Sequence, residues 1–128
     1  MAPVHKAGDA GAGVVSQLRK GVAPYCVLAL LARERRYGYD LARELGEVGV
    51  VASAGSVYPL LGRLQEAGWI EPSWRPMAEG VPRKYYALTA DGRVALRGFQ
   101  GLWPSFVQRI SRLLAVPPDA EHGDDRAR

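Results

Sequence analysis

Hydroxyl and guanidinium side chains recur along the segment 53–63, at spacings that would bring them together on one helix. Residues three or four positions apart share a helix face, so these polar groups would lie opposite a stripe of valine and leucine. Hydroxyls and backbone N–H groups at a helix N-terminus can bind phosphate oxygens, and an arginine can bind phosphate or guanine. The polar face comprises Ser53, Ser56, Tyr58, Pro59 and Arg63. Its composition predicts a contact with nucleic acid.

A second set of cations flanks a predicted β-hairpin. Two β-like runs, 69–74 and 83–89, are joined by a segment that contains proline and glycine, which suits a flexible tip. Arg83 and Lys84 open the second run, and Arg75 lies across the hairpin from them. Contacts from such side chains to phosphates carry affinity and salt dependence more than sequence choice.

Each of these residues also has a simpler interpretation when it is taken alone. Ser53 could do no more than cap a helix, Tyr58 could do no more than pack, and the arginines could form a solvated face. The interpretation as a DNA-binding set depends on the order of the elements that carry these residues, because a helix followed by a basic hairpin is a known DNA-binding arrangement.

Hydrophobic periodicity places two helices before the polar face. The first is predicted to begin at Ser16, after a Gly- and Ala-rich arm over residues 1–15, and only Pro24 interrupts it. The second is a short amphipathic helix that ends near Gly46 or Gly49.

The polar face belongs to a third helix, which Ser53 or Ser56 is expected to cap through its side-chain oxygen and Gly68 to close. Pro59 removes the hydrogen bond that its N–H would give to the carbonyl of Gly55, a loss that is tolerable close to the helix start. After the hairpin, Thr89 is expected to cap a last helix.

Three helices, a two-stranded hairpin and a closing helix are typical of a winged helix-turn-helix, a mainly α fold with a small β-hairpin. The predicted boundaries are an arm over 1–15, a winged helix-turn-helix over 16–89, a closing helix over 90–116 and an acidic flexible tail over 117–128. The second helix of such a pair lies in the major groove while the first crosses the backbone.

Composition sets the class of protein. The 128 residues, 48% of them hydrophobic, fit one domain with a modest core. Residues 1–116 hold fifteen basic and nine acidic side chains, a formal charge of +6, because the last twelve residues contain four of the acidic groups and two of the basic ones. A folded body with this surplus favours a polyanionic partner.

Cys26 is the one cysteine, and its apolar surroundings predict a small buried thiol in a reducing, cytoplasmic protein. The longest apolar run is about ten residues, short of the roughly 20 that span a bilayer, so no membrane association is expected. The two histidines, His5 and His122, lie in the two tails, and no cysteine or carboxylate cluster has metal-ligand spacing. The sequence therefore predicts neither an enzyme nor a cofactor.

Three successive segments carry a family resemblance. They are "SQLRKGVAPYCVLALLARERRYGYDLARELG", "SAGSVYPLLGRLQEAGWI" and "EGVPRKYYALTADGRVAL", and together they resemble the PadR family of transcriptional regulators from about Ser16 to Leu114. The resemblance implies a homodimeric winged-helix repressor that binds a palindromic operator. By the same resemblance the DNA-contacting positions are Ser56 and Tyr58 with their helix neighbours, and Arg83 and Lys84 of the wing. The chain departs from the family pattern in having a wing with few basic residues before Pro82.

The closing helix has a wide apolar stripe at helical spacing, more than a small domain can cover. A two-fold homodimer would bury the stripe twice and place two recognition helices roughly 34 Å apart. The alternative is that the helix folds back on its own domain. Gly98, Gly101 and Pro104 lower its helicity and are expected to bend or interrupt it. The stripe comprises Phe99, Leu102, Trp103, Phe106, Val107, Ile110, Leu113 and Leu114.

Trp103 is also a candidate ligand-binding residue. In the resembling family some members bind flat aromatic compounds between tryptophans at the dimer centre, and Trp103 falls near such a position. Plain interface packing is the other interpretation of this side chain. A rival function for the whole chain is a winged-helix module that binds protein through the apolar closing helix; the polar helix face and the basic wing favour DNA over it.

Overall fold

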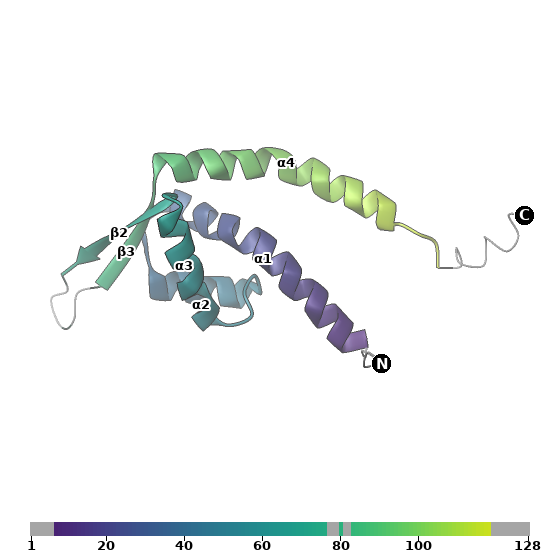
Figure 1. Cartoon of the computed structure of the whole chain (residues 1–128), viewed down its shortest axis with the longest axis horizontal. Coiled ribbons are helices and arrows are strands. Elements are labelled where there is room, and N and C mark those ends of the chain that lie inside the picture. The colour runs from purple at the N-terminus through teal and green to yellow at the C-terminus, as the bar shows by residue number, and fades with distance from the viewer. Residues whose placement is uncertain (1–6, 77–79, 81–82, 119–128) are drawn as a thin grey trace, which may run out of the picture. The chain divides into compact units, whose positions relative to one another are not determined.

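The computed structural model describes residues 7–76, 80 and 83–118. Predictions for residues 1–6, most of the hairpin tip with Pro82, His5, His122 and the tail from 119 onward lie outside the described residues. The elements follow one another as α1 (Ala7–Arg33), β1 (Arg36–Tyr37), α2 (Gly38–Val48), η1 (Ala54–Ser56), α3 (Val57–Glu66), β2 (Ile70–Arg75), β3 (Arg83–Leu88) and α4 (Ala90–Leu114) (Figure 1). The described chain divides into two units, one ending at Leu96 and the other beginning at Arg97.

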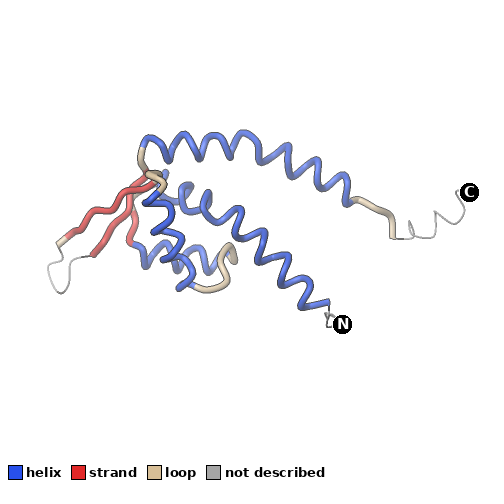
Figure 2. Tube along the Cα trace, viewed as in Figure 1, coloured by secondary structure: helices blue, strands red, loops and turns tan. Residues whose placement is uncertain are grey.

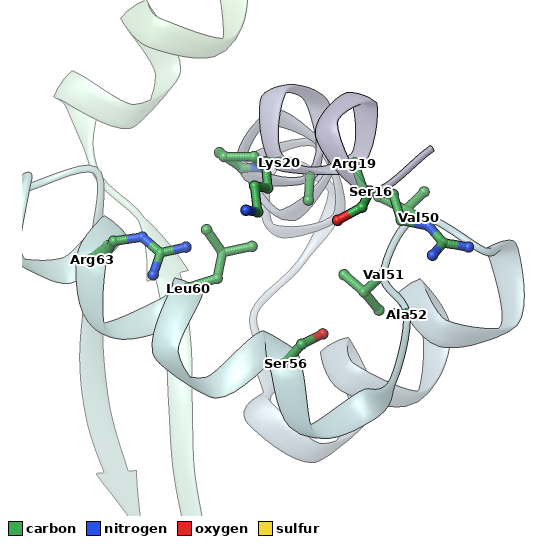
Figure 3. A pocket seen from close by; sticks show the side chains of 11 residues that line it. Ser16, Arg19, Lys20, Val50, Val51, Ala52, Ser56, Leu60 and Arg63 are labelled. Carbon is green, nitrogen blue, oxygen red and sulfur yellow. The ribbon is translucent and has the colours of Figure 1, made fainter. Parts of the chain in front are cut away.

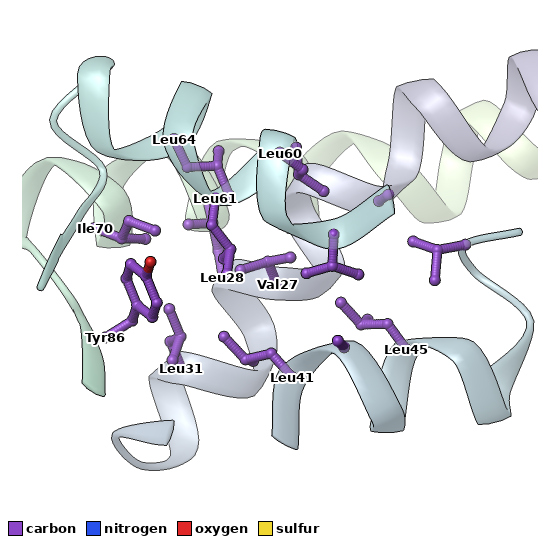
Figure 4. Close-up of a cluster of buried hydrophobic side chains, with 14 of the residues drawn as sticks. Val27, Leu28, Leu31, Leu41, Leu45, Leu60, Leu61, Leu64, Ile70 and Tyr86 are labelled. Carbon is purple, nitrogen blue, oxygen red and sulfur yellow. The ribbon is translucent and has the colours of Figure 1, made fainter. Parts of the chain in front are cut away.

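The core of the first unit lies between α1, α2 and α3, and the sheet closes one end of it (Figures 2 and 4). Leu28 of α1, Leu41 of α2 and Leu61 of α3 are fully buried there. Tyr86 and Ile70 extend the same cluster onto the strands. The four apolar residues predicted for the buried face of α3 are all buried: Val57, Leu60, Leu61 and Leu64.

The start of α1 corrects a prediction. The helix begins at Ala7, so residues 7–15 are helical and not an irregular arm. Alanine has the highest helix propensity, and the alanines here offset glycines that cost about 1 kcal/mol each. Pro24 lies inside α1 without ending it.

One stretch of α1, Gly13–Arg33, is long and apolar enough to cross a bilayer, with a mean hydropathy of 1.2. The longest uninterrupted apolar run had led to the expectation that no segment could span a bilayer, and this stretch of α1 differs from that expectation. Val27, Leu28 and Leu31 supply part of that apolar character and are buried in the core. Arg19 and Lys20 lie within the same stretch, and a charge at the centre of a membrane-spanning helix costs about 2.5–3.5 kcal/mol or more.

Two glycines end the helices of the helix-turn-helix. Gly49 follows α2 with φ +87°, and its N–H and that of Val50 donate to the carbonyl of Leu45. Gly68 follows α3 with φ +81°, and the N–H of Trp69 donates to the carbonyl of Leu64 at 3.0 Å. Both are left-handed caps that other residues adopt only with strain, so the predicted closures at Gly49 and Gly68 are confirmed.

The sheet has one strand more than the predicted hairpin. Its order is β1-β3-β2, with both pairs antiparallel. Arg75 pairs with Arg83 and Trp74 pairs with Lys84, which confirms the placement of Arg75 across the hairpin. β1 places Tyr37 opposite Tyr85. A strand of two residues has no periodicity of its own, so the sequence pattern could not indicate it.

Thr89 fixes the beginning of α4. Its hydroxyl oxygen accepts a hydrogen bond from the N–H of Gly92 at 3.0 Å, which confirms the predicted cap. The same hydroxyl donates to the carbonyl of Gly68 at 2.6 Å, and so ties the start of α4 to the end of α3. α4 continues through Pro104 to Leu114, so the predicted interruption at Pro104 does not occur.

Candidate nucleic-acid interface

The polar face predicted for the third helix is exposed on η1 and α3. Tyr58 is 48% exposed, and Ser56, Pro59 and Arg63 are exposed as well. Pro59 lies in the first turn of α3, which agrees with the prediction that it is close to the helix start. The serines do not act as predicted, because neither helix start has a side-chain cap. The Ser56 hydroxyl instead donates to the Ser53 carbonyl at 2.6 Å, since a 3₁₀ turn over residues 54–56 precedes the α-helix.

One hollow joins the recognition helix to the wing. Its volume is about 460 Å³, and Tyr58 of α3 lines it together with Arg83 and Lys84 of β3. The remaining lining residues are Tyr37, Gly38, Tyr39 and Tyr86. A Cβ atom on Gly38 would lie 3.4 Å from the rings of Tyr58 and Tyr86, so the glycine lets these rings approach the start of α2. The hollow is aromatic and cationic, and none of the lining residues that the structure describes is a carboxylate.

Two other polar residues of the face, Ser56 and Arg63, lie at a different place. Ser56 and Arg63 line a pocket of about 420 Å³ between α1 and α3, together with Arg19 and Lys20 (Figure 3). Its walls include apolar residues such as Leu60 and Val51, and the described part of the lining holds no acidic residue. The Arg19 Nε–H donates to the carbonyl of Gly49 at 3.1 Å, which holds this guanidinium beside the end of α2.

Aromatic rings hold each cation of the wing. Arg83 lies over the Tyr37 ring with its Cζ atom 5.0 Å from the centroid, and Arg75 lies over the Tyr85 ring at 5.1 Å. The Lys84 Nζ atom is 5.3 Å from the Tyr86 ring centroid and also faces Trp74. These distances fall within the range of cation–π attraction.

A hydrogen bond with Tyr37 is the main cause that raises the pKa of the Tyr85 phenol above its usual value. The face of an uncharged phenol ring carries the partial negative charge that attracts Arg75.

The predicted site residues thus fall into separate groups. The hollow brings Tyr58, Arg83 and Lys84 together, whereas Ser56 and Arg63 face α1. Pro59 and Arg63 also border a shallow depression along α3. Arg75 lies opposite Arg83, and Ser53 is exposed ahead of η1.

Sequence reasoning missed four residues that share these surfaces: Tyr37, Tyr39, Arg19 and Lys20. Tyr39 is two-thirds exposed at the start of α2. An aromatic residue on each side of Gly38 was the available signal for the tyrosines. The two cations of α1 could not be placed, because only the fold brings α1 beside α3.

The stripe of α4 is exposed along the second unit. Trp103 retains 40% exposure and Leu113 retains 76%. The Trp103 ring stacks on Phe99 with centroids 5.2 Å apart and lies tilted to Phe106 at 6.5 Å. The other exposed members are Leu102, Phe106, Val107, Ile110 and Leu114. Gly92 and Leu96 are the buried residues of this helix, and both belong to the first unit.

Comparison with known proteins identifies the fold and the family. The model of the Transcriptional regulator PadR-like family matches residues 27–98, more than half of the chain. The chain belongs to the PadR-like family of transcriptional regulators. A PadR-like regulator from Bacillus cereus is 36% identical, with a TM-score of 0.70 over 80% of this chain and 100% of that one. A PadR family regulator from Eggerthella lenta is 33% identical, with a TM-score of 0.74 over 86% and 96% of the two chains.

A third similar structure is Bacillus subtilis PadR, which was solved in complex with operator DNA. It is 28% identical to this PadR-like regulator, with a TM-score of 0.56, and the match covers 62% of this chain and 46% of that one. Membership of the family confirms the predicted winged helix-turn-helix fold and the prediction of a transcriptional regulator that is not an enzyme.

Proposed function

We propose that this PadR-like regulator binds a palindromic DNA operator as a homodimer and represses transcription from it. The observation that carries the proposal is the hollow in which Tyr58 of α3 meets Arg83 and Lys84 of the wing. The major groove of B-DNA admits one α-helix. With α3 in that groove, Tyr58 reaches base edges while the wing holds the adjacent backbone.

The charge of the surface supports this partner. Among the described lining residues of the hollow and of the α1–α3 pocket, none is acidic and five carry cationic side chains. These are Arg19, Lys20, Arg63, Arg83 and Lys84. Ser56 stands at the beginning of α3, where the positive end of the helix favours a phosphate. In the proposed complex, phosphates bind on both sides of the recognition helix.

The exposed stripe on α4 supports the homodimer. An apolar face of this extent on one helix is typical of a surface that pairs with another copy or another protein. A two-fold axis through paired α4 helices would present two copies of α3 to successive major grooves, roughly 34 Å apart. A palindromic operator follows from that symmetry.

The aromatic cluster around Trp103 supports release by a small aromatic ligand. Trp103, Phe99 and Phe106 form a run of neighbouring rings on the exposed stripe, and a flat apolar compound can stack on such rings. A ligand bound between two copies of α4 would change the separation of the two recognition helices and lower operator affinity.

A regulator that binds the chromosome acts in the cytoplasm, and this is the location proposed for the protein.

Charge reversal of the wing tests the proposal. We expect Arg83→Glu combined with Lys84→Glu to abolish operator binding in a fluorescence anisotropy titration while the oligomeric state in light scattering stays the same. Arg93→Glu with Arg97→Glu makes the same change in net charge elsewhere, on the exposed side of α4, and serves as the control. Unchanged operator binding by the wing variant would instead favour a winged-helix module that binds protein through the α4 stripe.

A further inference from the structure

The sheet carries a pair of stacked tyrosines on the face that turns away from the core. Tyr37 of β1 and Tyr85 of β3 are register partners, with ring centroids 3.9 Å apart and planes 29° from parallel. Tyr86, the next residue, is buried, and successive side chains of a strand point to opposite faces. The stack therefore lies outside the hydrophobic core, although it consists of two large aromatic side chains.

Two arginines stand on this stack. Arg83 covers the Tyr37 ring and Arg75 covers the Tyr85 ring, each with its guanidinium carbon about 5 Å from the ring centroid. Arg75 and Arg83 are also directly opposite each other in the ladder between β2 and β3. Like charges in such a cross-strand pair repel. Within the described part of the chain, neither arginine forms an ion pair with a carboxylate that would relieve the repulsion.

We propose that Tyr37 and Tyr85 are positioning residues that hold the guanidinium groups of Arg83 and Arg75 as a pair for one stretch of DNA backbone phosphate. The proposal rests on the DNA-binding function proposed above. A cation–π contact uses the flat face of a guanidinium and leaves its N–H edge free. That edge is the part that binds a phosphate with two parallel hydrogen bonds.

Pre-organisation is what the stack contributes. An arginine side chain has many rotamers, and binding is weakened by the freedom that the side chain loses. An arginine already held on a ring loses less freedom when the phosphate arrives. The phosphate also neutralises the repulsion between Arg75 and Arg83, which no described acidic side chain does.

The same proposal explains why a strand of two residues is present. β1 consists of Arg36 and Tyr37, and it extends the sheet on the side of β3 opposite to β2. Arg36 is anchored by an ion pair with Glu44 of α2, and this fixes the strand beside β3. With β1 in place, Tyr37 becomes the second ring of the stack and supports Arg83.

Two double-mutant cycles on the full-length protein test the inference. We expect Tyr85→Val to weaken binding to a duplex that the wild type binds specifically by about tenfold, and Arg75→Ala to weaken it by a similar factor. The two changes together should weaken binding no further than either alone, because the ring acts only through the arginine. Valine keeps the strand propensity of the position, and Tyr85→Phe, which keeps the ring, should bind as the wild type does.

The Tyr37 and Arg83 pair gives a second cycle, and this cycle tests the inference if the Tyr85→Val variant does not fold. The salt dependence of binding should fall by about one unit of slope in each variant that loses a phosphate contact. Additive losses, or a Phe variant as weak as the Val variant, would overturn the inference. If the wild type binds no duplex specifically, the proposed function itself fails. If the wild type binds a duplex specifically and the tyrosine variants bind it equally well, only the role of the tyrosines fails.

Discussion

The backbone carbonyl oxygen of Trp69 occupies the space in which a Cβ atom on Gly92 would stand. The first turn of α4 therefore packs directly against the chain that leaves α3, and the carbonyl of Trp69 also accepts the N–H of Thr89 at 3.1 Å. A Cβ atom at Gly92 would in addition lie 2.7 Å from a methyl carbon of Leu88. This contact joins the helix-turn-helix, the wing and the closing helix at one point.

Gly92→Ala should therefore destabilise the protein by about 3 kcal/mol, because backbone and the half-buried side chain of Leu88 must both move to admit the methyl group. Urea unfolding followed by circular dichroism measures the change. Gly98→Ala is the matched control on the same helix, where nothing lies within 4 Å of the added atom. The control should be neutral or stabilising by up to about 1 kcal/mol, and an equal loss in both variants would contradict the packing argument.

Thr89→Ala should reduce the free energy of unfolding by about 1 kcal/mol or slightly more. The hydroxyl caps the N–H of Gly92 and donates to the Gly68 carbonyl, so alanine leaves both groups without this partner. Thr89→Ser keeps the oxygen and should retain most of the stability. If the serine variant melts at the same temperature as the alanine variant, the hydroxyl is not the stabilising group.

Ile110→Asp should convert the proposed homodimer into monomers. Ile110 lies on the exposed apolar stripe of α4, and a carboxylate buried in a two-fold interface would face its own copy. Light scattering coupled to gel filtration gives the mass directly. Arg109→Asp introduces the same group one position away, off the stripe, and should leave the mass unchanged. A dimer in both variants would refute the role of the stripe.

Cys26 should react slowly with a thiol reagent in the native protein. Burial raises the pKa of the Cys26 thiol, so less of it is the reactive thiolate at a given pH than in the unfolded chain. The thiol is partly accessible and not fully enclosed as the sequence had suggested, so labelling should proceed without unfolding. Rates measured at pH 8 with and without denaturant test this expectation: a native rate equal to the denatured one would contradict it.

Much of the fold followed from local patterns. The leucines of α3, the glycine caps at Gly49 and Gly68, and the Thr89 cap each depend on residues close in sequence, so spacing and residue type were sufficient to predict them. The serine caps failed because a 3₁₀ turn ahead of α3 redirected the Ser56 hydroxyl to a carbonyl. The helical start of α1 was not predicted, because its glycines suggested an irregular segment although the run also has a high alanine content.

The candidate site was less accessible to sequence reasoning, because its contacts join distant segments. Tyr37 meets Tyr85 only through the pairing of β1 with β3, and Lys20 meets Arg63 only through the packing of α1 beside α3. Arg83 and Lys84 were recognised as a basic pair, but the rings beneath them were not. These contacts between distant segments depend on the tertiary structure, and the periodicity of the sequence does not indicate them.

Fluorescence anisotropy with the duplex immediately upstream of the regulator's own gene tests the central claim most directly. A titration across a salt series, with a scrambled duplex beside it, compares the wild type with Tyr58→Ala and Tyr58→Phe. The account predicts that the wild type prefers the genomic duplex, that its affinity falls steeply with salt, and that loss of the Tyr58 ring weakens binding at least tenfold. The claim would be contradicted if the wild type bound both duplexes equally and weakly and enriched no fragment from a genomic pool.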